Sequence, residues 1–226
     1  MLEPQIQRRR SPNAPHPVRK GEQVAAAARA LFLEHGFMDT SMDAIARRAA
    51  VSKATLYAYF PTKEALFASL IKAECEAVDE GFVVPDLSMG LKEALRAFAR
   101  RYCEIFRDGI SAAFFRVIAA ENGRFPDLCA LFVESGPQKA IARCAGLLTN
   151  ARDNGLLDIS DPKLAATQFL SLVRGDLPLH AALGLREPFG DSVEAMIDAG
   201  IDVFLRAYGG GNQVIQIPAV LSSRES

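Results

Sequence analysis

The chain has 226 residues, of which 50% are hydrophobic and 23% are charged, and its formal net charge is −1. This apolar content supports a sizeable core in one two-part protein or in two small domains. The apolar runs are too short to span a membrane, and the basic start is not followed by the apolar segment of a signal peptide. We therefore expect a cytoplasmic protein that does not contact membranes.

The charges are distributed unevenly along the chain. Residues 1–63 carry ten Lys or Arg and five Asp or Glu, a formal charge of +5, whereas residues 64–226 carry a charge of −6. A basic region of this kind can attract the phosphates of a nucleic acid. Ordinary charge scatter explains the same numbers, so the asymmetry alone does not decide between the two interpretations.

Neither metal nor catalytic motifs stand out. The four cysteines, Cys75, Cys103, Cys129 and Cys144, lie outside metal-clip spacing and in apolar helical stretches. They are expected to be free thiols in a reducing compartment. The chain also lacks a recognisable Ser/His/Asp arrangement and a glycine-rich phosphate loop. We predict no metal, no cofactor and no enzymatic activity.

Helical periodicity runs through nearly the whole chain and predicts an all-α protein of about nine helices. Gly36 and Gly155 are expected helix stops, and Gly136-Pro137 is expected to kink or split a longer helix. Pro178 is expected to bend or interrupt another. The expected helices cover residues 18–35, 42–49, 53–60, 63–80, 91–106, 110–120, 126–154, 162–184 and 189–207.

The helix predicted at 53–60 has the pattern of one that enters a DNA groove. Leu56 and Phe60 fall on one side and should face the core, while the small residues Ala54 and Thr55 lie opposite. Small side chains let the backbone approach base edges, and their methyl groups can touch thymine. Tyr57 and Tyr59 project from the two flanks of the helix. Their hydroxyls can donate to phosphates on the groove walls.

Neighbouring residues add to this predicted DNA interface. Lys53 lies in the first turn of the helix and Lys63 at the start of the next, and both are placed for phosphate or base contact; Ser52 is a natural N-cap. Thr40 or Ser41 should cap the preceding helix, whose free amide groups would form a phosphate site. Arg47 would add a backbone contact, or else lie on a solvated helix face.

These residues resemble the tetracycline-repressor-like (TetR) family of bacterial regulators. The resemblance is carried by about fifty contiguous residues, among them Gly36-Phe37, Thr40-Ser41-Met42, Ala49-Ala50-Val51-Ser52-Lys53, Thr55-Leu56-Tyr57 and Tyr59-Phe60. It implies that this domain binds an operator, that Thr55 and its neighbours read bases, and that the Tyr and Lys positions hold phosphates. Ala54 has no hydrogen-bonding group, so base readout here would rest more on apolar contact, Thr55 and Lys53.

The later part of the chain is similar to the AefR-like subgroup in the segments from Phe115 to Pro126 and from Phe169 to Leu177. The resemblance implies a helical domain that binds an effector and dimerises. Nine of the fourteen phenylalanines follow residue 90, and together with polar neighbours they would line a cavity. The alternatives are a plain aromatic core and structural salt bridges. The candidate ligand-binding residues are Phe98, Tyr102, Phe115, Arg116, Phe132, Phe169 and Arg174.

The helices predicted at 162–184 and 189–207 carry apolar stripes with small Ala and Gly positions. Paired with a second copy, they would form a four-helix bundle and a homodimer; the alternative is that both stripes are buried within one subunit. A dimer would bind a near-palindromic operator in double-stranded DNA. We expect a repressor that is released by a small apolar or amphipathic effector. An all-helical small-molecule carrier or adaptor remains the alternative.

The expected domain organisation has four parts. Residues 1–17 form a flexible basic leader, residues 18–63 the three-helix helix-turn-helix DNA-binding domain, residues 64–208 the effector-binding and dimerisation domain, and residues 209–226 a flexible tail. The leader would reach an adjacent minor groove or the DNA backbone, or else add only nonspecific attraction.

Overall fold

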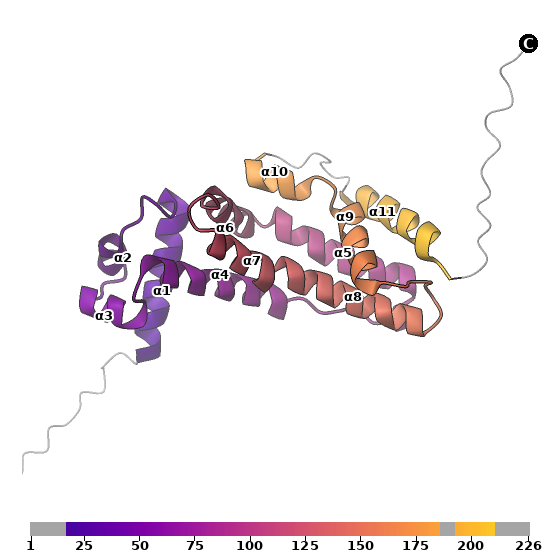
Figure 1. Ribbon diagram of the computed structural model, residues 1–226, viewed down its shortest axis with the longest axis horizontal. Helices are drawn as coiled ribbons and strands as arrows, with labels where there is room; N and C mark the ends of the chain where they lie inside the picture. Colours follow the sequence, from indigo (N-terminus) through magenta and orange to yellow (C-terminus); the bar gives the residue numbers. More distant parts are fainter. Residues whose placement is uncertain (1–16, 186–192, 211–226) are drawn as a thin grey trace, which may run out of the picture. The chain divides into compact units, whose positions relative to one another are not determined.

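The computed structural model describes residues 17–185 and 193–210, and this part of the chain is helical (Figure 1). The predicted all-α fold is confirmed, with eleven α-helices and a 3-10 helix in the described residues rather than about nine helices. None of the described helices is long and apolar enough to cross a membrane. The α-helices are α1 (Pro17–His35), α2 (Met42–Arg48), α3 (Lys53–Tyr59), α4 (Lys63–Glu80), α5 (Leu91–Arg107), α6 (Gly109–Ala120), α7 (Pro126–Ser135), α8 (Pro137–Asp153), α9 (Pro162–Arg174), α10 (Leu177–Leu183) and α11 (Val193–Tyr208).

The chain divides into two compact units, Met1–Leu70 and Ile71–Ser226. In the first unit, α1 packs against both α2 and α3. Three fully buried rings from α1, the following loop and α4 form its aromatic centre: Phe32 lies 5.5 Å from Phe37 and 5.0 Å from Phe67, measured between ring centroids. Ring pairs at these separations add packing energy beyond the burial of their area. This centre joins α1, the loop after it and the start of α4.

The turn between α2 and α3 contains an unusual backbone conformation. Ala50 has a φ of 52°, in the left-handed region. The amide of Val51 donates to the carbonyl of Ala46 at 3.0 Å, and the amide of Ala50 donates to Arg47 at 3.2 Å. These two bonds form a Schellman ending of α2, a motif that usually places glycine at the left-handed position. The chain uses alanine there instead.

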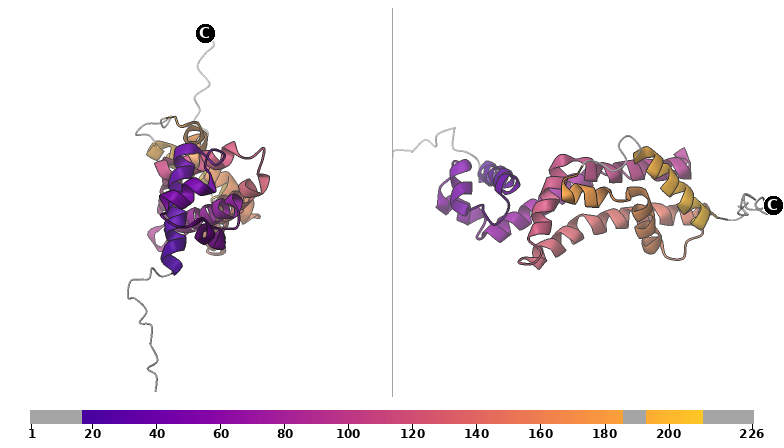
Figure 2. Two further views of the ribbon diagram at one scale, coloured as in Figure 1. Left: turned by 90° about the vertical axis from the view of Figure 1, so that its left-hand side faces the viewer. Right: turned by 90° about the horizontal axis from the view of Figure 1, so that it is seen from above.

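In the second unit, α9 packs against α5, α8 and α11 (Figures 1 and 2). Aromatic side chains of this unit pair across its elements. The ring centroid of Phe98 in α5 lies 4.7 Å from that of Phe82 in the loop after α4, and Phe169 in α9 lies 5.0 Å from Phe204 in α11. These four rings are buried together with aliphatic side chains of α5, α8, α9 and α11. The core of the second unit therefore lies around α9.

Two predicted helix boundaries have different outcomes. Gly136-Pro137 splits α7 from α8, as one of the two expected alternatives. The helix expected over 162–184 is interrupted, as one of its two expected alternatives, but the break falls at Gly175, where α9 ends and φ is 48°. Pro178 does not bend a helix: it lies in the first turn of α10, where a missing backbone N–H costs no intrahelical hydrogen bond.

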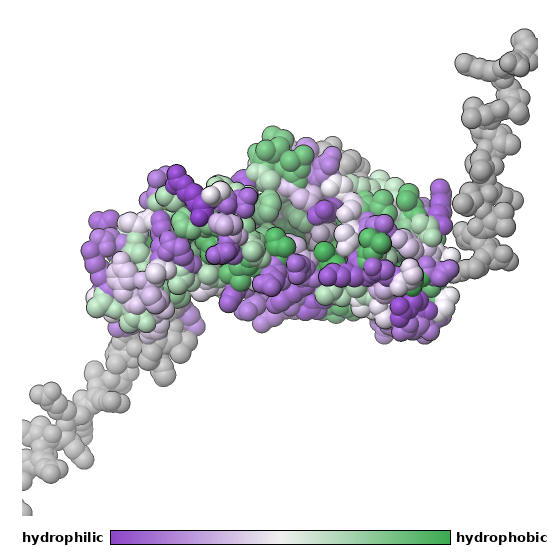
Figure 3. Space-filling model, in the orientation of Figure 1, coloured by the Kyte–Doolittle hydropathy of each residue, from purple (hydrophilic) through white to green (hydrophobic). Residues whose placement is uncertain are grey.

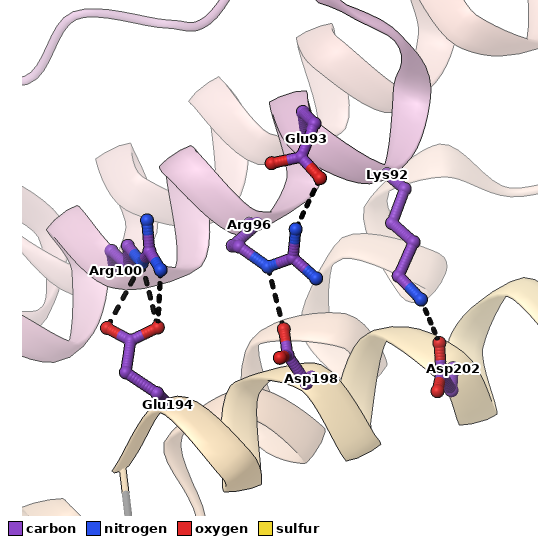
Figure 4. A network of polar contacts seen from close by, with 7 residues as sticks. All are labelled: Lys92, Glu93, Arg96, Arg100, Glu194, Asp198 and Asp202. Atoms are coloured by element: carbon purple, nitrogen blue, oxygen red, sulfur yellow. Dashed lines mark hydrogen bonds and ion pairs between the residues drawn. The ribbon is translucent and has the colours of Figure 1, made fainter.

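A row of ion pairs joins α5 to α11 (Figure 4). The three cations of the row lie on α5 and the three carboxylates that face them lie on α11. Glu93 of α5 also contacts Arg96, the middle one of these cations. The three interhelical pairs are Lys92–Asp202 at 2.7 Å, Arg96–Asp198 at 2.7 Å and Arg100–Glu194 at 2.8 Å. From one pair to the next the residue number rises by four on α5 and falls by four on α11, so the pairs fix an antiparallel register.

Candidate functional site

Helix α3 presents small residues on its outer side, as its periodicity predicts. Leu56 is fully buried, whereas Ala54 and Ala58 are exposed and Thr55 is half-buried. Ser52 caps the helix, since its hydroxyl oxygen accepts the amide of Thr55 at 3.1 Å. The Ser52 and Thr55 hydroxyls are also hydrogen-bonded to each other at 2.8 Å. A flat, short-chained face is thus held at the start of a capped helix.

The two tyrosines of α3 differ in their surroundings. The side chain of Tyr57 is 47% exposed and that of Tyr59 is 38% exposed. The ring of Tyr59 lies beside Gly21 of α1, where an added Cβ would be 3.6 Å from it. Tyr57 is therefore the more accessible of the two for a phosphate contact.

The cations around α3 have different partners. Lys53 forms an exposed ion pair with Asp43 at 2.7 Å. Arg48 binds Glu34 with two hydrogen bonds, of 2.6 and 2.7 Å, and this contact lowers the pKa of the Glu34 carboxyl. Arg47 is exposed and has no ion pair within the described chain. Exposed ion pairs contribute little to stability, so phosphates can compete for Lys53 at small cost.

Ser41, and not Thr40, is the N-cap of α2, because its hydroxyl oxygen accepts the amide of Ala44 at 3.1 Å. The side chain of Thr40 is only 2% exposed. Its hydroxyl donates to the carbonyl of Gly36 at 2.8 Å and approaches that of Leu31 at 3.2 Å. Of the two expected caps Ser41 therefore takes this role, while the Thr40 side chain satisfies carbonyls at the C-terminal end of α1; a DNA contact of Thr40 stays a prediction.

Lys63 also has a structural role that its sequence position did not indicate. Its ammonium donates to the carbonyls of Phe37 at 2.7 Å, Met38 at 3.2 Å and Thr40 at 3.0 Å. An ammonium has three N–H groups, and these three carbonyls use all of them. A phosphate contact would require Lys63 to give up at least one of these bonds.

The second unit contains a cavity of about 220 Å³. Its walls are mainly apolar and come from six helices, α4 to α8 and α10, together with the loop after α4 and the end of α9. The residues that line it are Glu74, Cys75, Val78, Asp79, Phe82, Tyr102, Ile105, Phe106, Ser111, Ala112, Phe114, Phe115, Phe132, Ser135, Gly136, Pro137, Ala140, Arg143, Arg174, Pro178 and Ala181.

Four of the seven predicted ligand-binding residues line this cavity: Tyr102, Phe115, Phe132 and Arg174. The other three lie elsewhere. Phe98 and Phe169 are fully buried in the core around α9, as the plain-core alternative holds. Arg116 donates to the carbonyl of Ala181 at 3.0 Å and holds α6 to α10. Helix periodicity identified buried aromatic faces but could not separate a cavity wall from a filled core.

The sequence interpretation missed the wall contributed by α4 and α8. Asp79 and Arg143 form an ion pair there, with Nε donating to Oδ1 at 2.6 Å, and Arg143 Nη1 also donates to the carbonyl of Phe82 at 3.1 Å. The hydrogen bond from Arg143 lowers the pKa of the Asp79 carboxyl. The spacing of Cys75, Val78 and Asp79 along one helix face was the available signal in the sequence.

The cysteines are buried or half-buried free thiols. Burial raises the pKa of Cys75, which lines the cavity, to about 11 and that of Cys103 to about 12. Burial also raises the pKa of Cys144. A thiol with a raised pKa is protonated near neutral pH and is a weak nucleophile.

An apolar groove lies on the outer side of α9 and α11. Gly200 of α11 packs against the backbone of Leu172, where an added Cβ would be 3.1 Å from its carbonyl carbon. Leu172 is 38% exposed and Val203 is 50% exposed. The groove is lined by Thr167, Gln168, Ser171, Leu172, Val203, Phe204, Ala207 and Tyr208. The groove lies on the two helices for which pairing was predicted, but most residues of their apolar stripes, such as Phe169, Ile197 and Ile201, are buried within the subunit.

Comparison with known proteins decides the family. Residues 24–70 match the family model of bacterial regulatory proteins of the tetR family, and residues 93–210 match the C-terminal domain of AefR-like transcriptional repressors. A curated relative, the HTH-type transcriptional regulator EthR of Mycolicibacterium smegmatis, is 30% identical over 191 residues, which are 83% of this chain and 85% of EthR. The chain belongs to the TetR family.

Solved structures of TetR proteins agree with this assignment. A structure described as the flavonoid-responsive regulator FrrA is 56% identical, covers 85% of this chain and 98% of its own, and superposes with a TM-score of 0.77. A TetR family regulator from Pseudomonas syringae pv. tomato is 28% identical, with coverage of 84% and 97% and a TM-score of 0.69.

Membership of the TetR family makes the chain a transcriptional regulator with a DNA-binding helix-turn-helix. Its homologues are transcriptional regulators and not enzymes. TetR-family regulators bind DNA and small-molecule effectors and act as dimers. In this TetR protein, α2 and α3 supply the helix-turn-helix, and the second unit supplies the cavity.

Proposed function

We propose that this chain is a dimeric repressor that binds a near-palindromic operator and leaves it when a flavonoid-type effector enters the cavity. The single observation that carries the proposal is the 56% identity to the flavonoid-responsive regulator FrrA over 98% of that chain. The effector is a flat, hydroxylated aromatic molecule, which is one form of the amphipathic ligand expected from the sequence.

The DNA-binding part of the proposal rests on α3. Ala54, Ala58 and Thr55 form a face without long side chains, so the helix backbone can approach base edges closely. Tyr57 extends beside this face and donates to a phosphate. Lys53 exchanges Asp43 for a phosphate on binding, and Arg47 adds a further backbone contact.

The effector part rests on the walls of the cavity. Phe114, Phe115 and Phe132 are aromatic wall residues, and the centroids of Phe115 and Phe132 are 5.6 Å apart. Flat aromatic ligands pack well against such rings. Two hydroxyls, of Tyr102 and Ser111, and the ion pair of Asp79 with Arg143 also line the cavity. These polar groups fix the orientation of a ligand.

Dimerisation is proposed through the outer face of α9 and α11. Leu164, Leu172 and Val203 are exposed apolar residues on these helices. Two copies related by a two-fold axis would cover them in a four-helix bundle. Each dimer then offers two copies of α3 to two half-sites.

Two linked measurements test the proposal. Selection of bound sequences from random double-stranded DNA should yield an inverted repeat, and a gel shift on this repeat should be reversed by 7-hydroxyflavone. Tyr57→Phe should weaken binding to all DNA sequences alike, because a phosphate contact carries no sequence information. Arg152→Gln, which removes an exposed cation paired with Asp153, is the matched control.

Three results would contradict the proposal. If the selection yields no preferred DNA sequence, the chain does not recognise an operator. If the selected sequence is a single half-site without an inverted repeat, the chain does not bind DNA as a two-fold dimer. If flavones at saturating concentration leave the gel shift unchanged, the effector is not a flavonoid.

A further inference from the structure

The charged groups around the cavity fall into two sets. Asp79 and Arg143 face each other across 2.6 Å and neutralise one another. Glu74, on the same helix as Asp79, is the other carboxylate of the lining. Arg174, the last residue of α9, has no ion pair with a carboxylate within the described residues. The lining therefore contains one cation neutralised by its ion pair, Arg143, and one cation without a carboxylate partner among the described residues, Arg174.

Arg174 lies next to a buried hydroxyl. Tyr102 of α5 is 7% exposed and lines the cavity with Arg174. Burial raises the pKa of Tyr102, and the nearby guanidinium of Arg174 acts against this rise. The remaining influences on Tyr102 come from the thiols of Cys103 and Cys144 and not from a carboxylate. Tyr102 and Arg174 are thus neighbouring polar groups in the lining of the cavity.

We infer that Tyr102 and Arg174 bind an ionised phenolic oxygen of the effector, and that this contact selects acidic hydroxyflavones over their neutral ethers. The inference rests on the proposed function and adds the charge state of its ligand. A half-buried guanidinium beside apolar walls is stabilised by an anionic oxygen, and charge-assisted hydrogen bonds are stronger than neutral ones. Tyr102 donates its O–H to the same oxygen.

The apolar walls make a phenolate a better occupant than a small inorganic anion. Ile105, Phe106 and Phe114 line the same cavity, and the ring of Phe106 lies 5.3 Å from that of Tyr102. Such side chains can contact an aromatic ring but leave a small ion poorly solvated. A phenolate carries its negative oxygen on an aromatic ring, so both parts of the site are satisfied at once.

The test compares 7-hydroxyflavone with 7-methoxyflavone, which differ in one ionisable proton. Calorimetric titration of the full chain should give about tenfold tighter binding of the hydroxyflavone at pH 8. In Arg174→Gln this preference should fall below about threefold, and in Arg174→Lys, which keeps the charge, part of it should remain. Arg152→Gln, an arginine outside the cavity lining, should keep the full preference.

The absorption spectrum of the bound flavone gives a second readout that a merely structural role of Arg174 would not move. The phenolate band of 7-hydroxyflavone should appear at lower pH on the protein than in buffer, because Arg174 favours the charged form. Arg174→Gln should abolish this difference. Asp79, Glu74 and Arg143 also face the cavity, so the titration is repeated in Asp79→Asn, where the difference should persist.

The outcomes separate the two proposals. Equal binding of both flavones to the unaltered chain, or an unchanged preference in Arg174→Gln, overturns the phenolate inference and leaves the flavonoid effector in place. If neither flavone binds and neither releases the operator, the flavonoid effector fails and the phenolate inference fails with it. Circular dichroism of each variant checks that the loss of preference does not come from unfolding.

Discussion

The ammonium of Lys63 lies 4.4 Å from the centre of the Phe37 ring and donates a hydrogen bond of 2.7 Å to the carbonyl oxygen of the same residue. Phe37 is fully buried in the aromatic centre of the first unit. One side chain therefore holds the loop between α1 and α2 from both its ring and its backbone, because a cation is attracted to the ring face and to carbonyl oxygens.

Replacing Lys63 by Met should lower the free energy of unfolding by about 2 kcal/mol, since three loop carbonyls lose a charged donor. Urea unfolding at fixed protein concentration measures the change. Lys72→Met, an exposed lysine of the same helix, should change stability little. An unchanged stability together with a smaller salt dependence of operator binding would instead make Lys63 a phosphate ligand.

Ala50→Gly should raise the free energy of unfolding by about 1 kcal/mol, because the left-handed conformation strains a residue that has a Cβ. Ala58→Gly, in the interior of α3, should lower it by about 0.5–1 kcal/mol, since glycine is unfavourable within a helix. Thermal unfolding of both variants compares the same chemical change in two backbone conformations. A loss of stability in Ala50→Gly would contradict the strain argument.

Gly200→Ala should destabilise the second unit by about 1–3 kcal/mol, because the new Cβ would lie 3.1 Å from the carbonyl carbon and oxygen of Leu172. Gly146→Ala in α8 is the matched control, as nothing lies within 4 Å of its added Cβ. It should stabilise the protein by up to about 1 kcal/mol through helix propensity. Equal effects of the two substitutions would show that α9 and α11 separate easily.

The pKa of Asp79 is lowered by Arg143, so the folded protein holds this proton less tightly than the unfolded chain. The resulting stabilisation is present above the ordinary Asp pKa of 3.8 and is lost as the pH falls through the lower folded value. Asp79→Asn should therefore lower the melting temperature at pH 7 and have a smaller effect near pH 3. A difference from the unaltered chain that stays constant between pH 7 and pH 3 would contradict this linkage.

Local patterns predicted much of the fold. The caps Ser41 and Ser52, the stop at Gly36 and the break at Gly136-Pro137 act on their immediate neighbours, so the sequence reveals them directly. The buried and exposed sides of α3 also follow from helix periodicity. The interruption between α9 and α10 was expected at Pro178 but falls at Gly175, because Gly175 takes up the turn conformation.

The details of the sites depend on contacts between distant residues, which periodicity does not encode. Lys63 has the spacing of a phosphate ligand, but its carbonyl partners lie 23 to 26 residues away. Phe98 and Tyr102 are one helical turn apart and both belong to the core, yet only Tyr102 also lines the cavity. The pair of Asp79 and Arg143 spans 64 residues and has no signal within a sequence window.

The ion pairs of α5 and α11 also bear on the proposed pairing of two subunits. Glu194, Asp198 and Asp202 would give α11 a negative edge that repels another copy of the same helix. Each faces a cation of its own subunit, so most of this repulsion is cancelled before two subunits meet. The edge left outward consists of exposed, uncharged side chains spaced four apart, namely Ala195, Ala199, Val203 and Ala207. Association along this edge should therefore depend on close fit, with little sensitivity to the salt concentration.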